Sequence, residues 1–201
     1  KSNAQDYVTE VDLLSQELIV EQIRVAMQRF GIAEHDFGFI GEESLAHNTT
    51  APHLFIIDPL DGTSSYVTQR ENGAFAISLA YACEQELLIG VIAEPKSGDV
   101  FYAQKGRGAW KVLGNDTQHT HAPLRILPSK ESVLFYNAST EERVNEKIME
   151  KVDALFASGL FSSKSLSHSC VSTAMRVAEN SCQMAINGKA YVWDIAAASV
   201  I

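Results

Sequence analysis

Cysteine, positive charge and long apolar runs are all scarce in this sequence. The three cysteines are odd in number and far apart, which argues against a disulfide framework or a zinc site and favours buried thiols in a reducing compartment. No apolar run is long enough for a membrane-spanning helix, and no signal peptide is visible. We therefore expect a cytoplasmic location and no membrane partner. The cysteines are Cys83, Cys170 and Cys182.

Acidic residues outnumber basic ones. The 25 Asp and Glu residues against 16 Lys and Arg residues leave a formal net charge of −9 at pH 7. Proteins that bind nucleic acid neutralise its phosphates with Lys and Arg. No basic run offsets the acidic excess here, so we expect no direct nucleic-acid partner. Bound cations would neutralise part of this charge.

Apolar periodicity predicts both helices and strands in the first part of the chain. Apolar residues at helical spacing predict one amphipathic helix over residues 14–30, with Gly31 as its stop. Alternating apolar residues predict an antiparallel pair of strands over residues 75–81 and 87–93, within a meander packed on helices. The pattern favours an α+β protein.

The 201 residues are enough for one large domain or two small ones. Pro123 and Pro128 bracket a plausible boundary, which predicts one half over residues 1–125 and another over residues 126–201. In the second half the patterns predict a strand over residues 132–136, helices over residues 144–156 and 171–178, and a strand over residues 182–186.

A central stretch carries two carboxylates that suit a metal ion. The apolar run 54–57 has strand character and is followed by Asp58 and Asp61. Pro59 and Gly62 predict a turn that carries these two aspartates. Hard cations such as Mg²⁺ take oxygen ligands and are usually held by a few carboxylates together with a substrate phosphate. The stretch therefore predicts a Mg²⁺ site.

Backbone groups of the same stretch add to this prediction. The carbonyl of Leu60 lies between the two aspartates and can serve as a further oxygen ligand. The N–H groups of Gly62, Thr63 and Ser64, at a predicted helix start, would point toward an anion such as phosphate. The alternative is that Asp-Pro and Asp-Gly pairs are ordinary turn chemistry without a ligand.

Four more acidic residues have both a functional and a plain structural explanation. Asp12 precedes the first helix, where a negative charge stabilises the helix dipole. Glu42 and Glu43 follow a short apolar run and are explained equally well as solvated surface charges. Asp194 stands where a helix cap would. By contrast, His119 and His121 lack an evident third ligand, so we do not expect a metal there.

Together these segments resemble a known family. In order along the chain, they are similar to the motifs of the metal-dependent, lithium-sensitive phosphatases of the inositol monophosphatase family. The central motif is the most specific, and the resemblance spans nearly the whole chain. The segments are Val8-Thr9-Glu10-Val11-Asp12, Gly41-Glu42-Glu43-Ser44, Asp58-Pro59-Leu60-Asp61-Gly62-Thr63, Trp193-Asp194-Ile195-Ala196-Ala197, Gly90-Val91-Ile92-Ala93-Glu94-Pro95 and Gly106-Arg107-Gly108-Ala109.

The resemblance implies a fold and an assembly. The family fold is a layered α-β-α-β-α sandwich, often assembled as a homodimer. The chain begins without Met and stops at Ile201 inside an apolar run. Compared with the family, we expect it to be truncated at both ends, so that the half over residues 126–201 is incomplete.

The resemblance also implies a role for each motif residue. Glu42, Asp58, the Leu60 carbonyl and Thr63 would surround the first Mg²⁺ and the phosphate. Asp61 and Asp194 would complete a second metal site. Glu43 would hold a third, weaker ion through water. Asp12 would hydrogen-bond Thr63 and help to activate the attacking water, so that the catalytic residues would be Asp12, Glu42 and Thr63. The residues implied to bind substrate are Gly62, Thr63, Ser64 and Asn187.

Two departures from the family pattern concern the substrate. Inositol-specific relatives carry Glu seven residues before the Asp of the last motif, where this chain has Asn187. The usual Gly before the substrate-contacting small residue is His168 here, unless Ser172-Thr173-Ala174 fills that role with a shift in alignment. Catalysis is therefore better supported than inositol specificity.

The resulting prediction is a Mg²⁺-dependent phosphomonoesterase, with two or three ions, that acts on a small polyol or sugar phosphate. Inositol monophosphate is the leading substrate. Fructose-1,6-bisphosphate, a 3′-phosphoadenosine nucleotide and histidinol phosphate are alternatives, because relatives share the same metal cage. A different class of function also stays open, a regulatory partner of the RNA machinery with weak catalysis.

Overall fold

The computed structural model describes residues 9–69, 73–125, 132–137 and 142–201. Two sheets organise these residues. The large sheet has eight strands in the order β2-β1-β3-β4-β5-β6-β7-β8, and the small sheet has three in the order β10-β9-β11. The large-sheet strands are β1 (Phe37–Gly41), β2 (Ala46–His47), β3 (His53–Asp61), β4 (Ala76–Cys83), β5 (Glu86–Glu94), β6 (Asp99–Gln104), β7 (Gly108–Val112) and β8 (Ala122–Pro123).

The small sheet and the helices complete the set of elements. The small sheet is parallel throughout. Its strands are β9 (Val133–Asn137), β10 (Ser163–Ser167) and β11 (Met184–Asn187); the helices are α1 (Glu10–Arg29), α2 (Thr63–Gln69), α3 (Glu142–Ala157), α4 (Cys170–Ala178) and α5 (Val192–Ile195), with a 3-10 turn at Glu34–Asp36.

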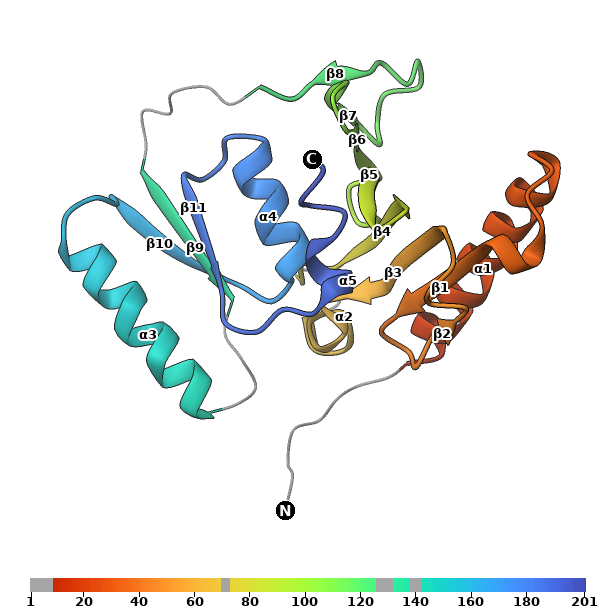
Figure 1. Ribbon diagram of the computed structural model, residues 1–201. Coiled ribbons are helices and arrows are strands. Elements are labelled where there is room, and N and C mark those ends of the chain that lie inside the picture. The colour runs from red at the N-terminus through yellow and green to blue at the C-terminus, as the bar shows by residue number, and fades with distance from the viewer. Residues whose placement is uncertain (1–8, 70–72, 126–131, 138–141) are drawn as a thin grey trace.

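The elements stack in five layers (Figure 1). Helix α1 covers one face of the large sheet at β3, and α4 and α5 cover the other face. The small sheet lies beyond α4, and α3 forms the outer layer on its far side (Figure 1). The layered α-β-α-β-α prediction is therefore confirmed. Among the described residues, no helix is long and apolar enough to cross a membrane.

Three apolar clusters hold the layers together. The largest joins the large sheet to the helices behind it and includes Ile56, Phe101, Val171 and Met175, so both halves of the chain contribute to it. The other two lie under α1 and under α3. The division into halves over residues 1–125 and 126–201 stays a prediction, and part of its boundary lies outside the described residues.

Helix α1 begins four residues earlier than the apolar period predicts. The cause is a capping box: the Thr9 side chain accepts from the backbone N–H of Asp12, and the Asp12 side chain accepts from the backbone N–H of Thr9. Asp12 thus lies inside the first turn rather than ahead of the helix. The predicted apolar stripe is only partly buried, because Leu14 and Leu18 are exposed while Ile23 and Met27 are buried.

The central strand runs further than the sequence predicts. Strand β3 continues through Pro59 to Asp61 instead of ending at a turn before it, and its register with β4 shifts between Asp58 and Asp61. Proline lacks an N–H for the ladder, so such an irregularity suits it. The turn falls at Gly62 alone, whose φ is +87°. A Cβ there would lie 2.7 Å from the Ala74 carbonyl oxygen, which explains the glycine.

Three smaller predictions need correction. The last strand begins at Met184, not at Cys182. Cys83 is half-buried, whereas Cys170 and Cys182 are buried as expected. All three are free thiols. Asp194 is not the cap of its helix: Tyr191 is the N-cap of α5, and the Asp194 carboxylate accepts from the Tyr191 backbone N–H at 2.7 Å.

Candidate metal centre

Three buried aspartates meet behind the end of β3. Asp58, Asp61 and Asp194 each offer a carboxylate oxygen, and these atoms lie within 4.8 Å of one another. The side chains are 1%, 8% and 8% exposed. In a regular strand, residues three apart point to opposite faces, so the register shift after Asp58 is what allows both β3 carboxylates to reach one place. Helix α5 brings the third from 133 or more residues away in the sequence.

Asp58 is the member that lacks compensation. Its Oδ1 accepts from the Leu60 N–H at 3.0 Å. Its Oδ2 is buried and has no hydrogen-bond partner among the described residues. Burial raises the pKa of Asp58 well above its ordinary value, and the negative charges of Asp61 and Glu42 add to this rise. A buried carboxylate oxygen without a donor, among other carboxylates, fits a hard cation such as Mg²⁺.

Asp61 is compensated by the start of α4. The Ser169 hydroxyl donates to its Oδ2, the Val171 N–H donates to the same oxygen at 2.8 Å, and the Cys170 N–H lies 3.3 Å from its Oδ1. Burial raises the pKa of Asp61, but these donors hold the rise to about 6. Asp61 therefore connects the metal centre to the helix between the two sheets.

Asp12 and Thr63 form a pair beside the aspartates. The Thr63 hydroxyl lies 3.1 Å from Asp12 Oδ1 and 2.9 Å from the Leu60 carbonyl oxygen, and its single proton can serve only one of them at a time. Asp12 is fully buried, and its other oxygen accepts from the Thr9 N–H at 2.8 Å. The predicted contact between Asp12 and Thr63 is present. Its role in activating water stays a prediction.

Glu42 and Glu43 are the two glutamates for which metal roles were predicted. Both come directly after β1. Averaged over all of its atoms, Glu42 is exposed, whereas Glu43 is half-buried. Removal of water from its carboxylate, together with the charges of Asp194, Glu43 and Asp61, raises the pKa of Glu42 to about 7. Glu42 therefore lies within electrostatic reach of the aspartates. The metal roles predicted for Glu42 and Glu43 stay predictions.

Position 187 lies at the carboxyl end of the parallel strands of the small sheet. Asn187 ends β11 and is opposite Asn137, which ends β9. Its Oδ1 is buried without a hydrogen-bond partner among the described residues. Asn137 donates to the sulfur of Cys170 at 3.0 Å, so this end of the sheet adjoins the start of α4. Ligands of parallel sheets bind at such carboxyl ends, and substrate contact by Asn187 stays a prediction.

Sequence reasoning missed the residues at the start of α4. Ser169 is the N-cap of this helix, and a serine directly before an apolar helical period is a recognisable cap signal. What the period cannot show is that this serine faces Asp61. Ser169 and Val171 donate to Asp61, whereas Ser172–Ala174 lie further along the helix. Which of these residues contacts the substrate stays a prediction.

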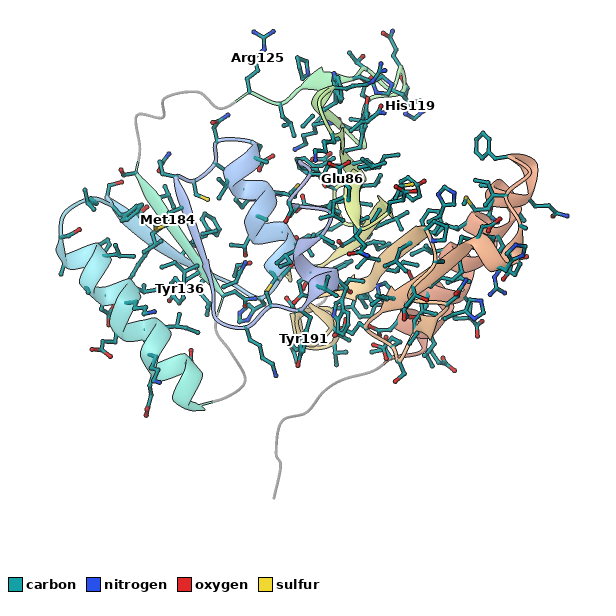
Figure 2. The ribbon with its side chains drawn as sticks, in the orientation of Figure 1. Glu86, His119, Arg125, Tyr136, Met184 and Tyr191 are labelled. Carbon is teal, nitrogen blue, oxygen red and sulfur yellow. The ribbon has the colours of Figure 1, made fainter. Side chains whose placement is uncertain are left out.

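Tyr191, whose backbone N–H donates to Asp194, shows where the site lies in the molecule (Figure 2). Tyr191 precedes α5 in the lower part of the view, whereas His119 and Arg125 lie at the top (Figure 2). His121, near His119, contacts the Tyr102 hydroxyl through its Nδ1. Among the described residues, the cluster of three or more potential ligands consists of the three aspartates, and neither histidine belongs to it. The expectation that the histidine pair binds no metal stays a prediction.

A testable consequence concerns pH and the metal-free protein. The folded-state pKa values of Asp61 and Glu42 are raised to about 6 and about 7 from ordinary values of 3.8 and 4.5. At pH values between the ordinary and the raised pKa of each group, the folded state binds more protons than the unfolded state. The unfolding free energy therefore falls as pH rises through this range. We expect a fall of about 1–2 kcal/mol between pH 5 and pH 7.5 for the metal-free protein from Asp61, with a smaller addition from Glu42, whose charge is screened by solvent.

Urea unfolding at a series of pH values, with chelator and with Mg²⁺, measures this effect. Mg²⁺ should reverse the slope, because the metal binds the deprotonated carboxylates. Stability of the metal-free protein that rises from pH 5 to pH 7.5 would contradict the assignment of the buried charges.

The chain is similar to known proteins in sequence. Residues 1–201 match the model of the inositol monophosphatase family. An inositol-1-monophosphatase of Bacillus subtilis is 29% identical over 201 residues, which cover 100% of this chain and 71% of that protein. A fructose-1,6-bisphosphatase/inositol-1-monophosphatase of Thermotoga maritima is 36% identical over 110 residues, which cover 55% of this chain and 39% of that protein.

The fold is also found among solved structures. A structure of an IMPase/NADP phosphatase complexed with Mg²⁺ and phosphate superposes with a TM-score of 0.73 at 26% identity, covering 100% of this chain and 69% of that one. Among curated relatives, the chain spans about two fifths of the length of the first three it matches.

Proposed function

Because the chain belongs to the inositol monophosphatase family, we propose that it hydrolyses the phosphate monoester of a small polyol or sugar with the help of Mg²⁺. Inositol monophosphate is the first candidate substrate. The observation that carries the proposal is the buried oxygen of Asp58, which has no hydrogen-bond partner in the described part of the chain and lies among the carboxylates of Asp61 and Asp194. Such a concentration of like charge is costly without a cation.

The proposal gives each part of the centre a task. Asp58, Asp61, Asp194, Glu42 and the Leu60 carbonyl would hold Mg²⁺, with Glu43 at a further, weaker site. When bound, Mg²⁺ is a Lewis acid that lowers the pKa of water and offsets charge on the phosphoryl group. Two or three ions are expected.

The residues around the metal ligands would complete the chemistry. Asp12 orients the Thr63 hydroxyl and, as a buried acceptor, can take a proton through it from the attacking water. Gly62 directly precedes α2, and Thr63 and Ser64 begin it. Backbone N–H groups at a helix start lack intrahelical acceptors and can face the phosphate. Asn187 would contact the hydroxyl groups of the leaving alcohol.

The substrate within this class is open to alternatives. Relatives are named for inositol phosphate, for fructose-1,6-bisphosphate and, among structures, for NADP. A 3′-phosphoadenosine nucleotide and histidinol phosphate are further alternatives. From the family we also expect lithium inhibition, a homodimer and a cytoplasmic location.

Phosphate release from a substrate panel tests the proposal. The panel holds inositol 1-phosphate, fructose-1,6-bisphosphate, 3′-phosphoadenosine 5′-phosphate and histidinol phosphate, each with Mg²⁺ and with excess chelator. We expect release from at least one member that the chelator abolishes. If no member is hydrolysed although calorimetry shows Mg²⁺ binding, two alternatives replace these four substrates: a substrate outside the panel, or the regulatory function as a partner of the RNA machinery with weak catalysis.

A further inference from the structure

Helix α4 is attached to the large sheet at both of its ends. At the N-terminal end, Ser169, Cys170 and Val171 donate to Asp61. At the C-terminal end, Arg176 and the cap residue Glu179 join an ion-pair network with three successive strands of the large sheet. We call this network the α4 clamp; it consists of Glu94, Asp99, Lys111, Arg176 and Glu179.

Arg176 is the centre of the α4 clamp. Its Nη2 lies 2.6 Å and 2.5 Å from the two carboxylate oxygens of Glu94, at the end of β5, and its Nη1 lies 2.5 Å from Glu179. Lys111 on β7 continues the network, with its Nζ 2.9 Å from Glu179 and 2.8 Å from Asp99 on β6. The planar guanidinium can therefore be held in one orientation by two carboxylates.

The α4 clamp differs from the exposed ion pairs of the same protein. Its side chains are between 13% and 27% exposed. In the pairs Lys105–Glu86 and Lys164–Asp153, the side chains are between 31% and 60% exposed. Exposed pairs contribute little to structure because water screens them. The shielding and the shared carboxylates of the α4 clamp make it a directional constraint.

The geometry of the helix carries this constraint to the metal centre. Arg176 lies seven residues, or about two turns, after Ser169, and a helix of this length is close to a rigid rod. The guanidinium Nε also lies 3.4 Å from the carbonyl oxygen of Ser172, within the helix itself. A change in the tilt or rotation of α4 at Arg176 must therefore displace the three donors that hold Asp61.

We propose that Arg176 is a positioning residue for the Mg²⁺ centre: by binding Glu94 it orients α4 so that Ser169, Cys170 and Val171 hold the Asp61 carboxylate in its metal-binding position. The inference rests on the proposed Mg²⁺ site. It assigns no contact between Arg176 and substrate or metal.

Calorimetric titration with Mg²⁺ tests this role without any measurement of turnover. We expect Arg176→Met to raise the Mg²⁺ concentration at half saturation at least tenfold. Arg176→Lys keeps the charge but not the two-oxygen grip, so it should restore part of the affinity. The control is Val152→Ala on α3, a fully buried residue in the separate cluster under that helix; it should lower the thermal midpoint and leave Mg²⁺ affinity within twofold of the original.

The outcomes separate the two proposals. Absence of Mg²⁺ binding by the unchanged protein would overturn the proposed function. Normal binding by the unchanged protein, with Arg176→Met within twofold of it or with Val152→Ala equally weakened, would overturn only the positioning role. If Arg176→Met does not fold, Glu94→Gln decides: a threefold or greater loss of Mg²⁺ affinity supports the role, and a smaller change rejects it.

Discussion

Replacement of Asp58 by asparagine should abolish Mg²⁺-dependent phosphate release while making the metal-free protein more stable. One buried oxygen of this carboxylate has no donor among the residues that the structure describes, and burial and neighbouring charge raise the pKa of Asp58. Asparagine removes the charge and supplies an N–H₂ group that can donate to the carboxylates of Asp61 or Asp194. A new hydrogen bond to a charged acceptor stabilises by about 1–3 kcal/mol.

Two measurements check this prediction. Turnover on whichever substrate the panel identifies should fall by about 10³-fold or more, because a charged metal ligand is lost. Urea unfolding in chelator at pH 8 should show a higher midpoint than the unchanged protein, and addition of Mg²⁺ should no longer raise it. Retained Mg²⁺-dependent turnover would disprove the metal assignment of Asp58.

The same substitution three residues later should have the opposite effect on stability. Asp61 accepts from the Ser169 hydroxyl and from the N–H groups of Val171 and Cys170. An asparagine side chain has one oxygen, and its N–H₂ group would face one of these donors. At least one buried N–H or hydroxyl group is then left without an acceptor. We expect Asp61→Asn to destabilise the metal-free protein by roughly 2 kcal/mol, after allowance for the relief of charge repulsion.

Asp58→Asn is the matched control for Asp61→Asn, since both remove one negative charge from the same cluster. Under identical urea unfolding in chelator, the two midpoints should move in opposite directions. If both variants gain stability, repulsion among the carboxylates outweighs the attachment of α4 to Asp61. If both lose stability, the cluster does not carry the excess of uncompensated charge that we infer.

The layers were predicted from the resemblance of the motifs to those of the inositol monophosphatase family. Apolar periods are local signals, and they placed α1, α3 and α4 and the antiparallel pair β4–β5 within a few residues. The limits of the elements were less predictable where a side chain intervened. The capping box between Thr9 and Asp12 lengthened α1, and the irregularity around Pro59 extended β3 past the expected turn.

The candidate site divides in the same way. The order of the motifs and the chemistry of their carboxylates indicated a Mg²⁺-dependent phosphatase, because ligand type is a property of individual residues. The contact of Asp12 with Thr63 followed from the resemblance and is present in the structure. What distinguishes Asp58 from Asp61 could not be predicted, because both are aspartates in one short motif.

The sequence by itself determined the residue types, the local elements and the family of this protein. Only the tertiary structure decided which carboxylate is compensated and which is not. The donors to Asp61 come from residues 108 to 110 positions away, and Arg176 meets Glu94 across 82 positions. Burial and hydrogen bonding depend on such distant neighbours, whereas helical and strand periods depend only on nearby ones.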